Sequence, residues 1–154
     1  MMVTMSALKE KLEADLTVAM KARDQVRTRT LRMALTAVTN EEKAGKQVRR
    51  LEDDEIVKVL TREAKKRREA AEAFAGAGRS EQAQAERDEH AVLEGYLPAQ
   101  LSDAELAEIV RKAIEETGAD GPRAIGQVMK VVNPQVAGRA EGGRVAAEVK
   151  RLLS

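Results

Sequence analysis

Residues 126–143, which read GQVMKVVNPQVAGRAEGG, decide how the C-terminal third of the chain is organised. An Asn133–Pro134 step and a group of glycines separate two stretches whose apolar residues recur at helical spacing. The residue before a proline is biased away from the helical region, so we expect the first helix to end near Val132. The second helix should begin between residues 138 and 142, because glycine marks turns and helix ends.

The composition of the chain favours helices over sheet. Apolar residues make up 43% of the 154 residues and charged residues 34%, while the only aromatic residues are Phe74 and Tyr96. A core built from leucine, valine, isoleucine, methionine and alanine favours helix. We therefore predict an all-α protein with both aromatic side chains in its core. RNA binding by base stacking is then disfavoured, which leaves contacts with the RNA backbone.

Helix-start and helix-end signals divide the upstream sequence. Ser6 is the expected N-cap of the first helix. Asp24 either caps a second helix or lies inside one continuous helix, and spacing alone leaves both open. That segment should end near Gly45. Four acidic residues at 52–55 should begin the next helix, because carboxylates favour the positive end of the helix dipole, and glycines at 76 and 78 should end it.

The remaining signals predict a hairpin and a second, smaller unit. A fourth helix should begin at Ser80 and stop at Pro98, which makes residues 51–97 a long helical hairpin. A Ser-x-x-Glu capping box at residues 102–105 should begin the fifth helix. The expected domains are an N-terminal helical bundle with the long hairpin over 1–98 and a C-terminal three-helix subdomain over 99–154.

The charge balance argues against indiscriminate binding of nucleic acid. Lysine and arginine total 27 against 26 aspartate and glutamate, which gives a formal net charge of +1. Binding through counterion release needs a cationic surface. A local basic patch made by folding remains open.

Targeting signals are absent from the sequence pattern. No apolar run approaches the roughly 20 residues that cross a bilayer. The N-terminus, MMVTMSALKEKLEAD, lacks a basic region followed by an uninterrupted apolar one, so we expect no secretory signal. The chain contains no cysteine and therefore no disulfide. We expect a cytoplasmic protein that makes no contact with membranes.

No group of side chains has the spacing of a catalytic or metal site. Adjacent acidic residues on a helix point about 100° apart and do not converge. His90 is the single histidine, with Glu86 and Glu94 one turn to either side, but zinc sites use more histidine or cysteine ligands. We expect His90 to be packed or half-exposed on its helix. We predict no catalytic residue, no metal and no cofactor.

Two groups of basic residues upstream are candidates for contact with RNA phosphates. The first is a run that comprises Lys65, Lys66, Arg67 and Arg68. It is either a solvated helix face with intrahelical ion pairs or part of a phosphate-contacting face. The same two interpretations apply to the second group, which comprises Arg23, Arg27, Arg29 and Arg32.

A third basic group lies in or next to residues 126–143. It comprises Lys130, Arg139 and Arg144. Glycines at 138, 142 and 143 allow close approach to the backbone and precede a helix N-terminus, where free N–H groups favour anions. The alternative is that these glycines only turn the chain.

The order and spacing of several motifs resemble the GatB/YqeY family, in particular its free-standing YqeY-like members. Arg29-Thr30-Leu31-Arg32-Met33 followed by Asn40-Glu41-Glu42 is similar to the family's second helix. The motifs similar to the family's hairpin are Lys66-Arg67-Arg68-Glu69, Phe74, Ala77-Gly78-Arg79 and Glu86. The residues similar to the junction between the family's two subdomains are Tyr96-Leu97-Pro98, Leu101 and Glu105. The most specific match comprises Gly126-Gln127-Val128-Met129-Lys130, Gly138-Arg139-Ala140, Gly143 and Val145.

The resemblance implies a two-part helical protein whose C-terminal part is similar to the tail domain of the B subunit of tRNA-dependent amidotransferase. That enzyme amidates misacylated Glu-tRNA(Gln) or Asp-tRNA(Asn), and its tail helps to hold the tRNA. This chain lacks the amidase subunit and the kinase-like cradle. A carbon–nitrogen ligase activity with glutamine as amido-N-donor would therefore come only from homology.

Three functional hypotheses follow. The first is a non-catalytic accessory protein of tRNA metabolism, which binds tRNA or an amidotransferase-type complex through its C-terminal subdomain. Lys130, Arg139 and Arg144 would contact phosphates, with Lys65 to Arg68 extending the surface. The second is a protein-interaction adaptor without RNA contact, which predicts a contiguous exposed patch of leucine, valine and methionine. The third is a component with carbon–nitrogen ligase activity.

Overall fold

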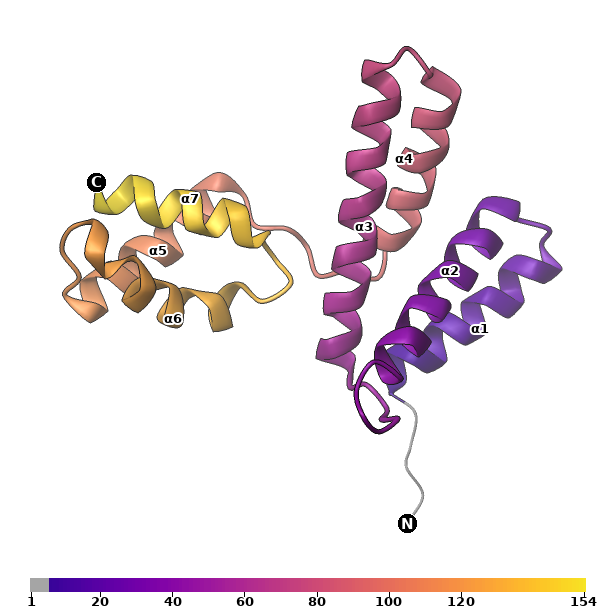
Figure 1. Ribbon diagram of the computed structural model, residues 1–154, viewed down its shortest axis with the longest axis horizontal. Coiled ribbons are helices and arrows are strands. Elements are labelled where there is room, and N and C mark those ends of the chain that lie inside the picture. Colours follow the sequence, from indigo (N-terminus) through magenta and orange to yellow (C-terminus); the bar gives the residue numbers. More distant parts are fainter. Residues whose placement is uncertain (1–5) are drawn as a thin grey trace. The chain divides into compact units, whose positions relative to one another are not determined.

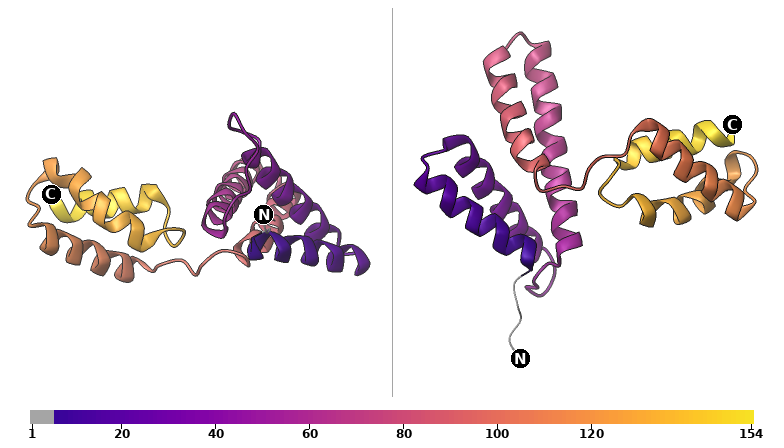
Figure 2. Two further views of the ribbon diagram at one scale, coloured as in Figure 1. Left: turned by 90° about the horizontal axis from the view of Figure 1, so that it is seen from below. Right: turned by 180° about the vertical axis from the view of Figure 1, so that it is seen from behind.

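The protein is all-helical, as the sequence predicts. The computed structural model describes residues 6–154, and within them seven α-helices, one short 3-10 helix and no strand are present. The helices pack into two compact units, and the chain passes from the first to the second between Leu97 and Pro98. Residues 1–5, the start of the segment considered for a secretory signal, lie outside the described part. Figures 1 and 2 show the helices of each unit.

The first unit contains two helical hairpins. In the first, α1 (Ala7–Lys21) and α2 (Gln25–Glu42) lie side by side in both figures. The Ser6 hydroxyl accepts a hydrogen bond from the Lys9 amide at 3.0 Å, so the expected N-cap is confirmed. The Asp24 carboxylate accepts one from the Arg27 amide at 3.1 Å. Asp24 therefore caps a separate second helix, which ends three residues before Gly45.

The predicted long hairpin is also present, with α3 (Asp53–Gly76) and α4 (Ser80–Glu94) packed against each other. Glu55 accepts a hydrogen bond from the Glu52 amide at 3.2 Å, which completes one side of a capping box at the acidic start of α3. Gly78, with φ of 75°, makes the turn between the two helices. The prediction that Pro98 stops α4 is wrong, because the helix already ends at Glu94 and Gly95.

The core of the first unit lies at the base of the α3–α4 hairpin, where the α1–α2 hairpin packs on it. Its larger buried members are Leu12, Leu31, Val38, Ile56, Leu60 and Leu93. Farther along the hairpin, the buried apolar side chains are two alanines, Ala71 and Ala83, which are not part of this cluster. The buried apolar side chains in the outer half of the hairpin are therefore small.

The prediction for the two aromatic residues is only partly correct. Tyr96 packs against the core of the first unit and is partly buried. Phe74 is half-buried near the end of α3, outside the core cluster. A phenyl ring this far along α3 lies beyond the reach of the α1–α2 hairpin, which packs at the base.

The second unit contains α5 (Asp103–Thr117), the 3-10 helix (Pro122–Ala124), α6 (Ile125–Val136) and α7 (Gly142–Leu153). Ser102 and Glu105 form the predicted capping box, with hydrogen bonds of 3.1 and 3.0 Å. Gly118 ends α5 in the left-handed conformation. The core of this unit is aliphatic, and its buried members are Leu101, Leu106, Val110, Ala113, Val128, Val132, Val136, Val145, Val149 and Leu153.

The prediction that α6 ends near Val132 is wrong, because the helix continues through Pro134 to Val136. Val128, Val132 and Val136 recur every four residues and are all buried. Burying one further valine contributes about 1.5–3 kcal/mol, which offsets most of the roughly 3 kcal/mol that a proline costs inside a helix. Pro134 also lies in the last turn and is exposed, so only one helical hydrogen bond is lost. α7 begins at Gly142, within the range of residues 138–142 predicted for its start.

Candidate nucleic-acid interface

Arg144, in the first turn of α7, is engaged inside the second unit. Its Nη2 atom donates to the carbonyl oxygen of Leu101 at 2.9 Å and to Oδ1 of Asp103 at 3.0 Å. Leu101 is buried, so its carbonyl gains a partner that water does not readily supply. The guanidinium therefore ties the start of α7 to the start of α5, and its first role is structural.

Arg139 lies in the loop between α6 and α7 and is half-buried. Its carbonyl oxygen accepts a hydrogen bond from the Leu101 amide at 2.7 Å, and its own amide donates to Val136 at 2.7 Å. Hydrogen bonds from Ser102 hold the pKa of Glu105 below its usual range, and the positive charge of Arg139 acts in the same direction. The loop is thus fixed through its backbone, which leaves the half-exposed side chain at the surface.

Lys130 is exposed on α6 and has neither a hydrogen bond nor an ion pair with the described part of the chain. The three predicted residues therefore occupy different situations. Lys130 is available to a ligand, Arg139 is partly available, and Arg144 is used internally. The expected set is reduced from three free cations to two.

The sequence around Lys130 has a local excess of positive charge that the net charge of the whole chain does not show. Residues 121–140 contain three basic residues, Arg123, Lys130 and Arg139, and no acidic residue. Arg123 and Lys130 are exposed, together with Gln127 of α6. A cationic stretch without carboxylates favours a polyanion, even though the chain as a whole is almost neutral.

The run from Lys65 to Arg68 is not a free basic face. Lys65 lies 3.9 Å from Glu69 and Lys66 lies 3.1 Å from Glu63, so both form intrahelical ion pairs at the surface. Arg68 is half-buried and also has an interaction partner. The solvated-face interpretation describes these lysines.

The placement of Arg67 on a phosphate-contacting face is wrong, because its side chain is buried. Its Nη1 atom lies 3.2 Å from Glu63 and its Nη2 atom lies 3.5 Å from the sulfur of Met33. Its Nε atom has no hydrogen-bond partner among the described residues. Nothing in the sequence around Arg67 indicates this burial, because Met33 comes from α2 and approaches only in the folded unit.

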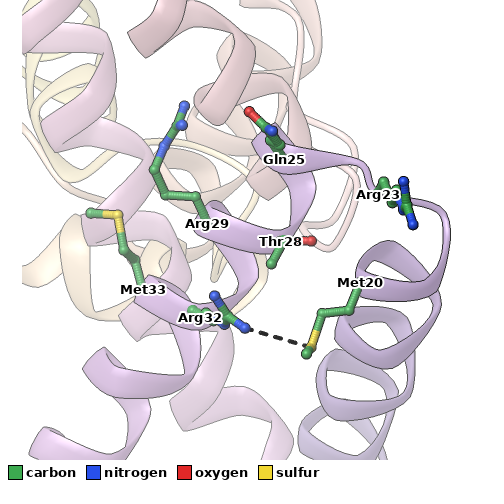
Figure 3. A pocket seen from close by; sticks show the side chains of 7 residues that line it. All are labelled: Met20, Arg23, Gln25, Thr28, Arg29, Arg32 and Met33. Carbon is green, nitrogen blue, oxygen red and sulfur yellow. Dashed lines mark hydrogen bonds between the residues drawn. The ribbon is translucent and has the colours of Figure 1, made fainter.

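The second basic cluster gathers at the turn between α1 and α2, where it lines an open groove of about 590 Å³. Figure 3 shows Arg29 and Met33 on one side of this groove and Arg23 on the other, with Arg32 and Met20 pointing toward each other between them. The complete lining is Met20, Arg23, Gln25, Thr28, Arg29, Arg32 and Met33. We call these seven residues the turn groove.

Arg27, the fourth member of that cluster, does not line the turn groove but contacts Tyr96. Its Nη2 atom lies 3.4 Å from the tyrosine oxygen, and the Tyr96 hydroxyl donates to Oδ2 of Asp15 at 2.6 Å. The Lys11 ammonium lies 5.6 Å from the centre of the ring. Burial raises the pKa of Tyr96, and the hydrogen bond to Asp15 raises it further. This group fastens the end of α4 to α1 and α2.

The patch predicted by the adaptor hypothesis has a partial counterpart. The large apolar side chains that are exposed in the described residues are Val18, Met20, Met33 and Val48. All four lie in the first unit, and two of them line the turn groove. Leucine is not among them, so the exposed large apolar side chains are valine and methionine only.

His90 is half-buried on α4 with its Nδ1 atom 3.7 Å from Glu94, as the sequence predicts. Carboxylates of Glu52, Asp54 and Glu55 approach within 4.8 Å of one another at the start of α3. Two of these carboxylates already have partners, because Glu55 binds Arg49 at 2.6 Å and Asp54 accepts from the Glu55 amide at 3.0 Å. The acidic cluster is explained by capping of the helix.

Comparison with known proteins covers both units. The family profile described as "Yqey-like protein" matches residues 9–153. The chain belongs to the YqeY-like family. The resemblance seen in the motifs is thereby confirmed for almost the whole length. One relative of this YqeY-like chain is Altered inheritance of mitochondria protein 41, mitochondrial, from Pyrenophora tritici-repentis. It is 28% identical over 133 residues, which cover 84% of this chain and 71% of the relative.

This YqeY-like protein has two candidate surfaces, residues 121–140 and the turn groove. Both lie inside the residues that match the family. None of the helices in residues 6–154 has the length and apolarity required for a membrane span. A cytoplasmic location stays a prediction, and the relative's name is mitochondrial. The methionines of the turn groove were missed from the sequence, where Met20 and Met33 read as ordinary helix positions. Their only signal was their place beside the arginines.

Proposed function

We propose that this YqeY-like protein is a non-catalytic accessory protein of tRNA metabolism. Its second unit binds the tRNA backbone, either on free tRNA or within an amidotransferase-type complex. The observation that carries the proposal is the stretch 121–140, which places three basic residues and no acidic residue on and beside α6. The similarity of its motifs to the amidotransferase tail domain supports the choice of tRNA.

The contacts are assigned to the cations that the fold leaves available. Lys130 is exposed and has no ion pair with the described residues, and Arg123 is exposed in the 3-10 helix that precedes α6. Arg139 adds a half-exposed guanidinium from the adjoining loop. Phosphates accept hydrogen bonds from such groups without regard to base sequence. Arg144 supports this surface from within, through the Leu101 carbonyl.

Binding of total tRNA as a function of salt tests the proposal. The wild type should bind with an affinity that falls as salt rises, and Lys130→Ala combined with Arg139→Ala should weaken binding. The slope of the logarithm of the binding constant against the logarithm of salt should decrease by roughly 1–2, because each phosphate contact contributes about 0.7–0.9.

A matched variant separates local contacts from overall charge. Lys112→Ala combined with Arg87→Ala also removes two exposed cations, but both lie outside residues 121–140. This control should bind tRNA like the wild type. Equal losses in the two double variants, or no salt-dependent binding by the wild type, would refute the proposal.

A further inference from the structure

We propose that the turn groove is a second binding site, which takes an acidic amphipathic helix of a partner protein. Apolar side chains of that helix would cover Met20 and Met33, and its carboxylates would pair with Arg23 and Arg32. The site lies entirely within the first unit and is independent of the tRNA surface assigned to the second.

The backbone at the turn holds the groove open in a fixed shape. The Asp24 amide donates to Ala19 at 3.0 Å and the Arg23 amide donates to Met20 at 3.2 Å, which together form a Schellman motif at the end of α1. The Asp24 carboxylate then caps α2. With both helix ends satisfied, the positions of the groove residues on α1 and α2 are set before any ligand arrives.

The charge of the groove selects an acidic ligand. None of the described residues that line it is acidic. Arg29 is partly neutralised, because its Nε atom lies 3.0 Å from the buried Glu89 carboxylate. Arg23 and Arg32 are exposed and form no ion pair with the described residues. Two uncompensated guanidinium groups therefore remain at the surface, where carboxylates of a partner can pair with them.

The apolar part of the groove selects a protein segment. Met20 and Met33 are 49% and 43% exposed, although methionine in a folded protein is usually buried. Met33 is held by the buried Arg67, whose Nη2 atom lies 3.5 Å from its sulfur, while the Met20 sulfur lies 3.8 Å from Nη2 of Arg32. Flexible, polarisable methionines are typical of surfaces that accept apolar faces of helices. RNA would leave them uncovered, since no aromatic ring lines the groove for base stacking.

The probe is a fluorescein-labelled helical peptide of about five turns, with leucines at i, i+3, i+4 and i+7 and glutamates on the flanking positions. Its partner probe has lysine at every glutamate position. Fluorescence anisotropy with the full chain should show saturable binding of the acidic peptide and much weaker binding of the basic one. Amide chemical-shift changes should centre on residues 20–33.

Two variants at exposed positions test the two halves of the proposal. Arg32→Glu replaces an attraction by a repulsion. It should lower the affinity for the acidic peptide roughly tenfold, on the scale of exposed ion pairs. The same variant should strengthen the basic peptide, which a loss of folding would not do. Met20→Ser should lower the affinity for both peptides roughly fivefold, because it removes apolar contact. Arg87→Glu and Val48→Ser change exposed positions outside the groove and should leave binding unchanged.

The outcomes separate the two proposals. Loss of peptide binding in Arg32→Glu with unchanged tRNA binding supports a protein site on the first unit. No saturable binding of the acidic peptide, equal binding of the two peptides, or equal effects in the control variants would overturn it. Displacement of the peptide by tRNA, with tRNA binding abolished by Arg32→Glu, would reassign the groove to RNA and would leave the Lys130 and Arg139 test to decide the function of the second unit.

Discussion

Replacement of Arg23 by glycine should stabilise the first unit. Arg23 has φ of 58° and is the one residue other than glycine with a positive φ in the described chain. It occupies the position after the end of α1 where helices commonly have glycine. A left-handed conformation costs an L-residue roughly 1–2 kcal/mol, while the greater freedom of unfolded glycine costs about 0.5–1 kcal/mol. The expected net gain is therefore about 0.5–1 kcal/mol in the free energy of unfolding.

The distribution of aromatic residues provides an assay specific to this unit. Tyr96 is the only tyrosine, the chain has no tryptophan, and Phe74 also lies in the first unit. Tyrosine emission during urea unfolding therefore reports on the first unit alone. The midpoint should move to a higher urea concentration in Arg23→Gly. The slope of the free energy of unfolding against urea concentration should stay unchanged, which indicates a change in stability rather than in the compactness of either state.

Arg23→Ala is the control, because alanine also lacks the guanidinium but keeps the left-handed strain. It should unfold near the wild-type midpoint. If glycine and alanine at this position gave the same midpoint, backbone strain at Arg23 would be refuted as the cause. A lower midpoint for Arg23→Gly would have the same consequence.

The remaining predictions concern three side chains that the folded units enclose. Arg144→Ala should destabilise the second unit by about 1–3 kcal/mol, because the Leu101 carbonyl loses its partner, and amide exchange in α7 should accelerate accordingly. Arg67→Met should be tolerated better than Arg67→Ala, since both variants remove the unpaired Nε atom but only methionine fills the space, and circular dichroism melts should rank the two variants. Tyr96→Phe should cost about 1 kcal/mol through loss of the bond to Asp15. Because folding raises the pKa of Tyr96, its contribution is fully present below the unfolded pKa near 10 and is lost as pH rises through the folded value. Urea midpoints from circular dichroism at pH 8 and pH 11 should therefore converge between wild type and Tyr96→Phe.

Each of these three predictions has an outcome that contradicts it. Unchanged α7 exchange in Arg144→Ala would show that water replaces the guanidinium. Equal melting of the two Arg67 variants would show that filling the space of the buried side chain does not contribute to stability. A constant difference between wild type and Tyr96→Phe across the pH range would show that the phenol does not titrate with unfolding.

The parts of the fold that local chemistry controls were predictable from the sequence. The caps at Ser6 and Ser102 involve donors three residues away, so the pattern of neighbouring residues is sufficient. Asp24 shows the limit, because its carboxylate is an N-cap only if α1 stops just before it. That stop depends on the left-handed Arg23, a residue type that gives no warning of it.

Features created by packing between distant segments were not predictable. Pro134 favoured an early end to α6, and the burial of Val136 against the rest of the second unit overrides it. Arg67 reads as one cation in a run of four, yet it is buried with Met33 of another helix as a neighbour. The exposed methionines at the turn could be recognised only once α1 and α2 had been placed side by side.

The unequal packing of the α3–α4 hairpin has a consequence for how the first unit opens. Its base is anchored by large aliphatic side chains, whereas its outer half has Ala71 and Ala83 as buried apolar contacts and ends in Gly78. The outer turns of the hairpin should therefore unfold locally and transiently while its base stays folded. Amide protons beyond Ala71 should exchange with solvent long before those near Leu60, and short insertions at the Gly78 turn should leave the rest of the unit folded.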